Sequence, residues 1–174
     1  MTQHQVLTIE ELNALDAEAF TASLADIFEH SPWIPAAASP MRPFVDIASL
    51  HAALCSVLRD ARDDAKLALI RAHPRLAGKA AIRGELTDAS TREQQGAGLS
   101  NCSAEEFRLL NEFNDAYDQR FGFPFILAVR GHTPSSIIDN MQGRIGNDRE
   151  AEFAEALRQI EAIAMARLSD KLQH

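Results

Sequence analysis

The chain has few of the residue patterns on which metal and nucleotide sites depend. Its two cysteines, Cys55 and Cys102, are far apart and lack the paired spacing of a zinc site or a redox dithiol. We expect two reduced thiols, and the sequence alone leaves a disulfide open. No two of the six histidines lie three to five residues apart, and Gly96 and Gly98 are not followed by the lysine of a phosphate-binding loop. We therefore expect no bound metal and no cofactor.

Basic residues and long apolar runs are also scarce. The 17 lysines and arginines are outnumbered by 25 aspartates and glutamates, which gives a formal charge of −8. A surface that follows nucleic-acid phosphates or anionic lipids needs an excess of positive charge, so we expect neither kind of partner. No stretch approaches the length of a membrane span, and no secretory signal pattern is present. We expect a cytoplasmic protein with no membrane contact.

What the sequence does contain is helical periodicity. Capping boxes at Thr8–Glu11 and Ser103–Glu106 predict two helix starts, and Pro134 is suited to the first turn of another helix. Apolar residues at helical spacing predict helices over 20–28, 47–58, 67–73, 107–122, 137–145 and 148–168. In a chain of 174 residues that is 46% hydrophobic, this pattern predicts an all-α fold, a compact single-domain multi-helix bundle over residues 1–174.

Two stretches interrupt the helical pattern. Residues 31–45 carry four of the seven prolines, and we interpret them as a surface connection. Phe123–Val129 is short and apolar with Pro124 inside it, and it is the one strand-like segment. Its periodicity does not distinguish a strand from a buried turn or a helix start.

A polar stretch from residue 73 onward carries most of the chemistry. Pro74 restricts the backbone of His73 to extended conformations, so the preceding helix should end here and leave the imidazole at its carboxyl end. A histidine can exchange protons near neutral pH. Ser90 and Glu93 have the spacing of a capping box, which gives them a purely structural interpretation as a helix start. A His-Pro step can likewise serve only to end a helix.

Three motifs occur in order along the chain: HPRLAGK at 73–79, LTDASTREQ at 86–94 and RFGFPFILAVRG at 120–131. Together they resemble the 2-oxo-4-hydroxy-4-carboxy-5-ureidoimidazoline (OHCU) decarboxylases, the last enzymes on the route from urate to allantoin. The resemblance continues through 144–147 to Arg167 and covers nearly the whole chain. It implies a cofactor-independent carboxy-lyase that acts on a small molecule, yields (S)-allantoin and CO2, and forms a homodimer.

The resemblance also implies a set of site residues. His73 would be the catalytic acid/base and Glu93 its carboxylate partner. The substrate would be bound by side chains and by backbone amides of the following residues: Pro74, Ser90, Gln94, Phe125, Ile126, Leu127 and Arg167. Arg120, Arg130 and Arg144 could also orient substrate, but salt bridges within this acidic chain explain them equally well.

Two other interpretations remain open at this point. One is a lyase or hydrolase that acts on another small nitrogen heterocycle, since the same acid/base pair could serve a different ring. The other is a non-catalytic helical interaction module, in which the motifs are helix caps and core. A module should lose little when His73 is changed, whereas either enzyme should lose its activity.

Overall fold

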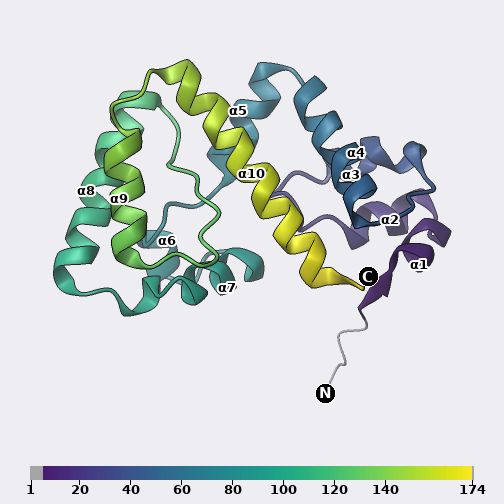
Figure 1. The fold of residues 1–174 in the computed structure, drawn as a ribbon, viewed down its shortest axis with the longest axis horizontal. Helices are drawn as coiled ribbons and strands as arrows, with labels where there is room; N and C mark the ends of the chain where they lie inside the picture. Colours follow the sequence, from purple (N-terminus) through teal and green to yellow (C-terminus); the bar gives the residue numbers. More distant parts are fainter. Residues whose placement is uncertain (1–5, 174) are drawn as a thin grey trace. The chain divides into compact units, whose positions relative to one another are not determined.

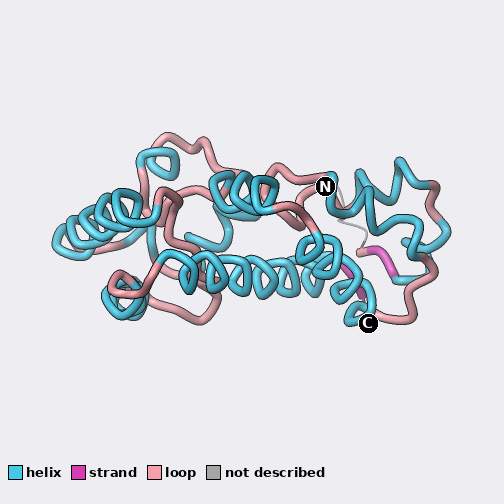
Figure 2. Tube along the Cα trace, turned by 90° about the horizontal axis from the view of Figure 1, so that it is seen from above, coloured by secondary structure: helices cyan, strands magenta, loops and turns pink. Residues whose placement is uncertain are grey.

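The structure of the chain, a computed structural model, is predominantly helical, as expected, with loops between the helices (Figure 2). It describes residues 6–173, the side chain of residue 80 excepted. In chain order the elements are β1 (Leu7–Thr8), α1 (Ile9–Ala14), α2 (Ala17–Ser23), α3 (Trp33–Ala38), the 3-10 helix η1 (Ser39–Met41), α4 (Ile47–Asp60), α5 (Asp63–Ala72), α6 (Lys79–Ile82), α7 (Asp88–Gly96), the 3-10 helix η2 (Leu99–Asn101), α8 (Ala104–Phe121), α9 (Pro134–Arg144), α10 (Arg149–Lys171) and β2 (Leu172–Gln173). None of the described helices is long and apolar enough to cross a membrane.

The backbone contacts divide the chain into two units. Unit 1 comprises Met1–Leu69 and Glu161–His174, and unit 2 comprises Ile70–Ile160. The expectation of one domain over residues 1–174 stays a prediction.

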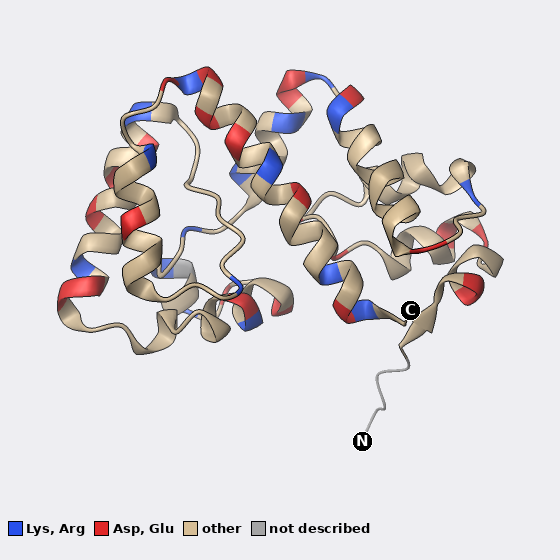
Figure 3. Cartoon of the chain, viewed as in Figure 1, with Lys and Arg blue, Asp and Glu red and all other residues tan. Residues whose placement is uncertain are grey.

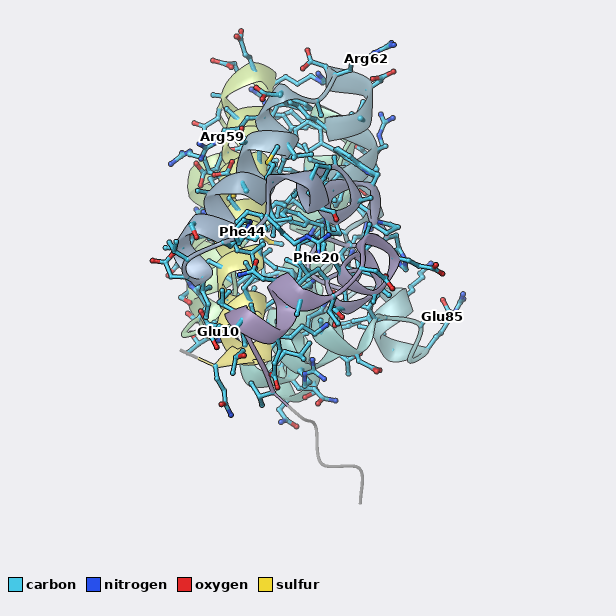
Figure 4. All side chains as sticks on the ribbon, turned by 90° about the vertical axis from the view of Figure 1, so that its right-hand side faces the viewer. Glu10, Phe20, Phe44, Arg59, Arg62 and Glu85 are labelled. Carbon is cyan, nitrogen blue, oxygen red and sulfur yellow. The ribbon has the colours of Figure 1, made fainter. Side chains whose placement is uncertain are left out.

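In unit 1 the two ends of the described chain pair with each other. Strand β1 pairs in parallel with β2, with Leu7 opposite Leu172, next to the end of α10 (Figure 1). Inside the unit, Phe20 and Phe44 stack with their ring centroids 6.2 Å apart (Figure 4). Aromatic pairs at this separation add to the stabilisation that comes from burying the two rings.

Two expectations for unit 1 were wrong. The helix predicted over 20–28 ends at Ser23, although its apolar residues are all buried. The hydroxyls of Thr21 and Ser23 bond to carbonyls four residues earlier, a contact that weakens a helix. Residues 31–45 are no mere surface connection, because they form α3 and η1 and bury Ile34. Pro35 is in the first turn of α3, where the missing N–H has no helical partner to lose.

Unit 2 is built around α8. The predicted capping box at Ser103 is present, and the helix ends where Gly122 adopts a φ of 76°. Helix α9 packs beside α8 (Figure 1). Acidic and basic residues are interspersed along α8 (Figure 3), and its inner face buries Tyr117 and Phe121 in an aromatic cluster with Phe123.

The segment 123–129 forms neither a strand nor a helix start, so of the alternatives that its periodicity left open the structure shows an irregular buried segment. Pro124 has no N–H to give to a sheet. The carbonyl of Ile126 accepts from Arg144, and the amide of Ala128 donates to Gln159. Side chains, rather than a neighbouring strand, therefore fix this backbone.

Candidate active site

Helix α5 ends where the sequence predicts. Its last residue is Ala72, and the amide of His73 donates to the carbonyl of Ile70 at 3.2 Å before Pro74 turns the chain away. His73 is buried, with 8% of its surface exposed. The imidazole is therefore attached to the end of a regular helix and largely shielded from water.

The residues that follow, 73–78, form what we call the His73 loop, which is held by two helices. From α7, the Gln94 amide accepts from the amide of Ala77 at 3.0 Å and donates to the carbonyl of Arg75 at 3.2 Å. From α8, Asn114 donates to the carbonyl of Leu76 at 2.9 Å. Both side chains are buried, so three consecutive residues of the loop have their backbone fixed by buried amides.

The loop needs this support because its conformation is strained. Ala77 has a φ of 52°, in the left-handed region that costs a non-glycine residue roughly 1–2 kcal/mol. A Cβ on Gly78 would lie 2.9 Å from the Cβ of Arg75, so only glycine fits there. Hydrogen bonds of about 1 kcal/mol each offset the strain. The side chains of α7 and α8 set the shape of the loop.

Arg75 adds an outer attachment that no pattern in the sequence indicated. Its Nε donates to Asp118 at 2.9 Å and its Nη1 to Asp115 at 2.7 Å, both on α8. The three side chains are partly exposed, so each ion pair contributes about 1 kcal/mol or less. Their value is geometric, since they tie the loop to the same helix as Asn114.

The capping-box interpretation of Ser90 and Glu93 was wrong. Helix α7 begins one turn earlier, with Thr87 as its N-cap accepting from the amide of Ser90 at 3.3 Å. Threonine and serine are both good caps, and the earlier hydroxyl takes the position. Ser90 and Glu93 therefore lie within the helix, where capping does not explain their side chains.

Ser90, Glu93 and Gln94 share one face of α7, because residues three and four positions apart are neighbours on a helix. Gln94 shows that this face meets the His73 loop. Ser90 is buried and Glu93 is half-buried. The structure thus brings these three predicted site residues to the helix face that supports the loop of His73.

The backbone of Phe125, Ile126 and Leu127 is buried and irregular. Among residues 6–173, the structure gives no hydrogen-bond partner to the amides of these three residues. These amides are not used in secondary structure, which is what the predicted role of binding substrate oxygens requires.

The same segment is anchored by a buried ion pair. Arg144 donates to the carbonyl of Ile126 at 2.7 Å, lies over the Phe125 ring and pairs with Glu152 at 2.9 Å. Glu152 also accepts from the Tyr117 hydroxyl and from Asn147. Burial raises the pKa of Glu152 and lowers that of Arg144, whereas the pairing favours both charges. Of the two interpretations of Arg144, the structure shows the internal salt bridge.

Helix α8 is the common support of both segments. Asn114 holds the His73 loop, and one turn later the Tyr117 ring packs edge-on against Phe125, with centroids 5.4 Å apart. A rigid helix that contacts both segments fixes their separation.

Arg167 belongs to unit 1. It lies on α10, buried, and donates to the Glu29 carboxylate at 3.1 Å and to the carbonyl of Asp26 at 3.2 Å. It is therefore not the exposed cation that commonly occupies a helix carboxyl end. Its contact with substrate stays a prediction.

Both cysteines are free, as expected, and burial raises the pKa of Cys55 to about 11, which keeps it a thiol. Among the described residues, no cluster of histidine, cysteine, aspartate and glutamate has a metal-holding arrangement. The groups gathered in unit 2 are a histidine, a carboxylate, a hydroxyl and amides, which serve proton transfer and hydrogen bonding.

Comparison with known proteins supports the sequence resemblance. A model of the OHCU decarboxylase family matches residues 13–169. The chain belongs to this family. The OHCU decarboxylase of Haloferax volcanii is 36% identical over 95% of this chain and 96% of its own length. The uric acid degradation bifunctional protein PucL of Bacillus subtilis is 39% identical over 95% of this chain, which spans only 33% of that protein.

Two solved structures are also similar. A crystal structure of (S)-allantoin synthase has a TM-score of 0.76 and 31% identity, over 95% of this chain and 54% of that one. A crystal structure of an OHCU decarboxylase in the presence of (S)-allantoin has a TM-score of 0.70 and 20% identity, over 90% and 97%. The second likeness supports the all-α fold alone.

Proposed function

We propose that this chain decarboxylates OHCU to (S)-allantoin and CO2, as the last step of urate degradation to allantoin. The observation that carries the proposal is the buried His73, held at the end of α5 by the helix face that bears Ser90, Glu93 and Gln94. This arrangement occurs in a chain that belongs to the OHCU decarboxylase family.

The chemistry needs proton transfer rather than a redox group. The bond between the ring carbon and its carboxyl group breaks, and the electron pair moves toward the neighbouring imine. The imine nitrogen, which receives the displaced electrons, takes up a proton. The hydroxyl on the ring carbon that lost the carboxyl group then gives up its proton and becomes a carbonyl, while the former imine carbon gains a proton on one face. We assign acid/base transfer to His73. Glu93 is the carboxylate that orients the imidazole and stabilises its protonated, positively charged form. No cofactor is required.

Binding groups surround this pair in the proposal. Ser90 and Gln94 hydrogen-bond the polar ring or its ureido group, and Pro74 forms a wall beside His73. The amides of 125–127 meet substrate oxygens, and Arg167 meets the anionic or carbonyl edge through a charge-assisted bond. Two observations support these assignments. Within the described residues the backbone amides of 125–127 have no hydrogen-bond acceptor, and Ser90, Glu93 and Gln94 lie on one face of α7.

Replacing Glu93 with glutamine should lower kcat by about 100-fold with little change in melting temperature, because the carboxylate partner is lost while the helix start is not. Turnover and thermal unfolding are measured on the same preparation. Ser103→Ala is the matched control, since it removes a real cap worth about 0.5–2 kcal/mol and should lower stability with kcat unchanged. If Glu93→Gln instead lowers the melting temperature and leaves kcat unchanged, as expected for Ser103→Ala, the role of Glu93 is structural.

Replacing Arg167 with lysine should raise KM about tenfold or more, because an ammonium keeps the charge but loses the planar two-pronged contact. Some stability should be lost as well, through the Glu29 pair. Lys171→Ala, one helical turn later, breaks an exposed pair with Asp26 and serves as the control. Steady-state kinetics equal to those of the wild type would remove Arg167 from the site.

We also propose a homodimer located in the cytoplasm. The support for the homodimer is the resemblance of the three motifs to the family. Sedimentation of the purified protein would give the mass of the assembly directly.

The direct test of activity is the rate at which fresh OHCU disappears and releases its carboxyl carbon as CO2. OHCU also decays spontaneously, so the expected result is a rate that increases in proportion to protein concentration. A rate equal to the spontaneous one at every protein concentration would refute the proposal. The same assay with other small nitrogen heterocycles tests the alternative substrate class.

A further inference from the structure

We propose that Asn114 is a positioning residue for His73, acting through the His73 loop. The inference rests on the proposed function of His73 as the acid/base. Asn114 is 1% exposed, and its Nδ2 donates at 2.9 Å to the carbonyl of Leu76, 38 residues earlier in the chain. It does not touch the imidazole through this bond.

The acceptor of this hydrogen bond lies outside the helix of Asn114, unlike the acceptors of two other asparagines on α8 and α9. Asn111, one turn earlier on α8, donates to its own helix at the carbonyl of Phe107, and Asn140 on α9 donates to that of Ser136. Asparagine is a poor residue for a helix interior, and burying its amide costs free energy unless it is bonded. Asn114 is buried inside a helix despite both costs, and its hydrogen bond goes to the His73 loop.

Little freedom remains between this anchor and the imidazole. His73 is fixed on one side by its bond to Ile70. On the other side the backbone of 75–77 is held by Gln94 and Asn114. Only Pro74 lies between these anchors, and its ring fixes φ. A shift of the Leu76 carbonyl is therefore passed on to the direction of the His73 side chain.

The strain at Ala77 gives Asn114 a second effect. The left-handed backbone there persists only while the surrounding bonds hold it. Without the Asn114 bond, the loop can relax toward an ordinary conformation, and the chain on either side must rotate. Gln94 also holds the loop in this conformation, but it is proposed to contact substrate, so a Gln94 variant would not separate positioning of His73 from substrate binding. Asn114 has no proposed substrate contact.

The sharpest variant is Asn114→Asp, which has nearly the same shape but presents an acceptor to the Leu76 carbonyl when ionised. Burial raises the pKa of such a carboxyl, and its protonated form regains a donor. We expect kcat at pH 8 to fall at least about tenfold with KM within about twofold, because a small misplacement of a reacting group lowers rate more than binding. The ratio of variant to wild-type kcat should rise as pH falls toward 6.

Asn111→Asp is the matched control, with the same substitution on the same helix and a side chain bonded to that helix alone. It should keep wild-type kcat at every pH. A fall in the melting temperature of Asn114→Asp with unchanged kcat would overturn the proposal. So would an equal loss in both variants.

The imidazole itself supplies a readout that needs no substrate. NMR signals of His73, assigned by their loss in His73→Asn, should shift and titrate differently in Asn114→Asp and not in Asn111→Asp. If Asn114→Asp fails to fold, Asn114→Ser, which is neutral and too short to reach Leu76, takes its place in both measurements. Unperturbed His73 signals would refute the positioning role. Failure of the wild type to consume OHCU would instead refute the proposed function and leave this test standing.

Discussion

The variant His73→Asn should lose at least about 100-fold in kcat, the smaller end of the effect expected when a proton-transfer group is removed. Asparagine can take the place of the imidazole and make hydrogen bonds, but it does not titrate. The fold should survive, since the end of α5 depends on Pro74 and the loop is held by Gln94 and Asn114. Turnover of OHCU and the thermal unfolding curve, measured together, check both halves of this prediction.

His132→Asn is the matched control for this experiment. His132 lies before α9, and its Nδ1 is 2.9 Å from the hydroxyl of Ser136. Loss of this contact should leave kcat unchanged. If His73→Asn also retains nearly full turnover, another group performs the proton transfer and the assignment of His73 is wrong.

Glu152→Ala should produce the largest loss of stability, about 3–5 kcal/mol in the free energy of unfolding. The variant leaves the largely buried Arg144 without its counter-charge and deprives Tyr117 and Asn147 of their acceptor. Urea unfolding with a linear extrapolation measures the change. Activity should fall too, because Arg144 also holds the carbonyl of Ile126 beside the amides proposed to bind substrate.

The exposed pair of Arg108 and Glu105 on α8 provides the comparison. Glu105→Ala breaks an ion pair in water, where solvent screens the attraction, so the free energy of unfolding should change little. A combined Arg144→Met, Glu152→Leu variant should recover part of the stability lost in Glu152→Ala, because no charge is left unpaired. An unfolding free energy for Glu152→Ala equal to that of Glu105→Ala would mean that the buried pair contributes little.

Local signals in the sequence predicted those features of the fold that depend on neighbouring residues. The caps at Thr8 and Ser103 and the end of α5 at His73 were confirmed, since each needs only a hydroxyl or a proline at a fixed position. Local signals failed where two patterns competed. Thr87 and Ser90 both fit a cap, and the prolines of 31–45 fit a helix start as well as a loop.

Features that depend on distant contacts had no local signal. Nothing near Asn114 indicates that its partner is Leu76, and the pairing of Arg144 with Glu152 depends on how α9 meets α10. The sequence pattern indicated His73 as a group able to transfer protons, whereas the roles of Glu93 and Arg167 came from the family resemblance alone. The structure adds the physical support for His73 and Glu93, namely a buried imidazole, a braced loop and a helix face that capping does not explain.

Circular dichroism of fresh OHCU, recorded with and without the protein, measures whether the protein directs the decarboxylation to one enantiomer of allantoin. Spontaneous decay of OHCU cannot favour one enantiomer of allantoin, whereas protonation on one face within a protein site does. We expect the signal of (S)-allantoin to grow at a rate proportional to protein concentration and to be lost with His73→Asn. Consumption of OHCU with no net dichroism, or a signal of the (R) enantiomer, would contradict this expectation.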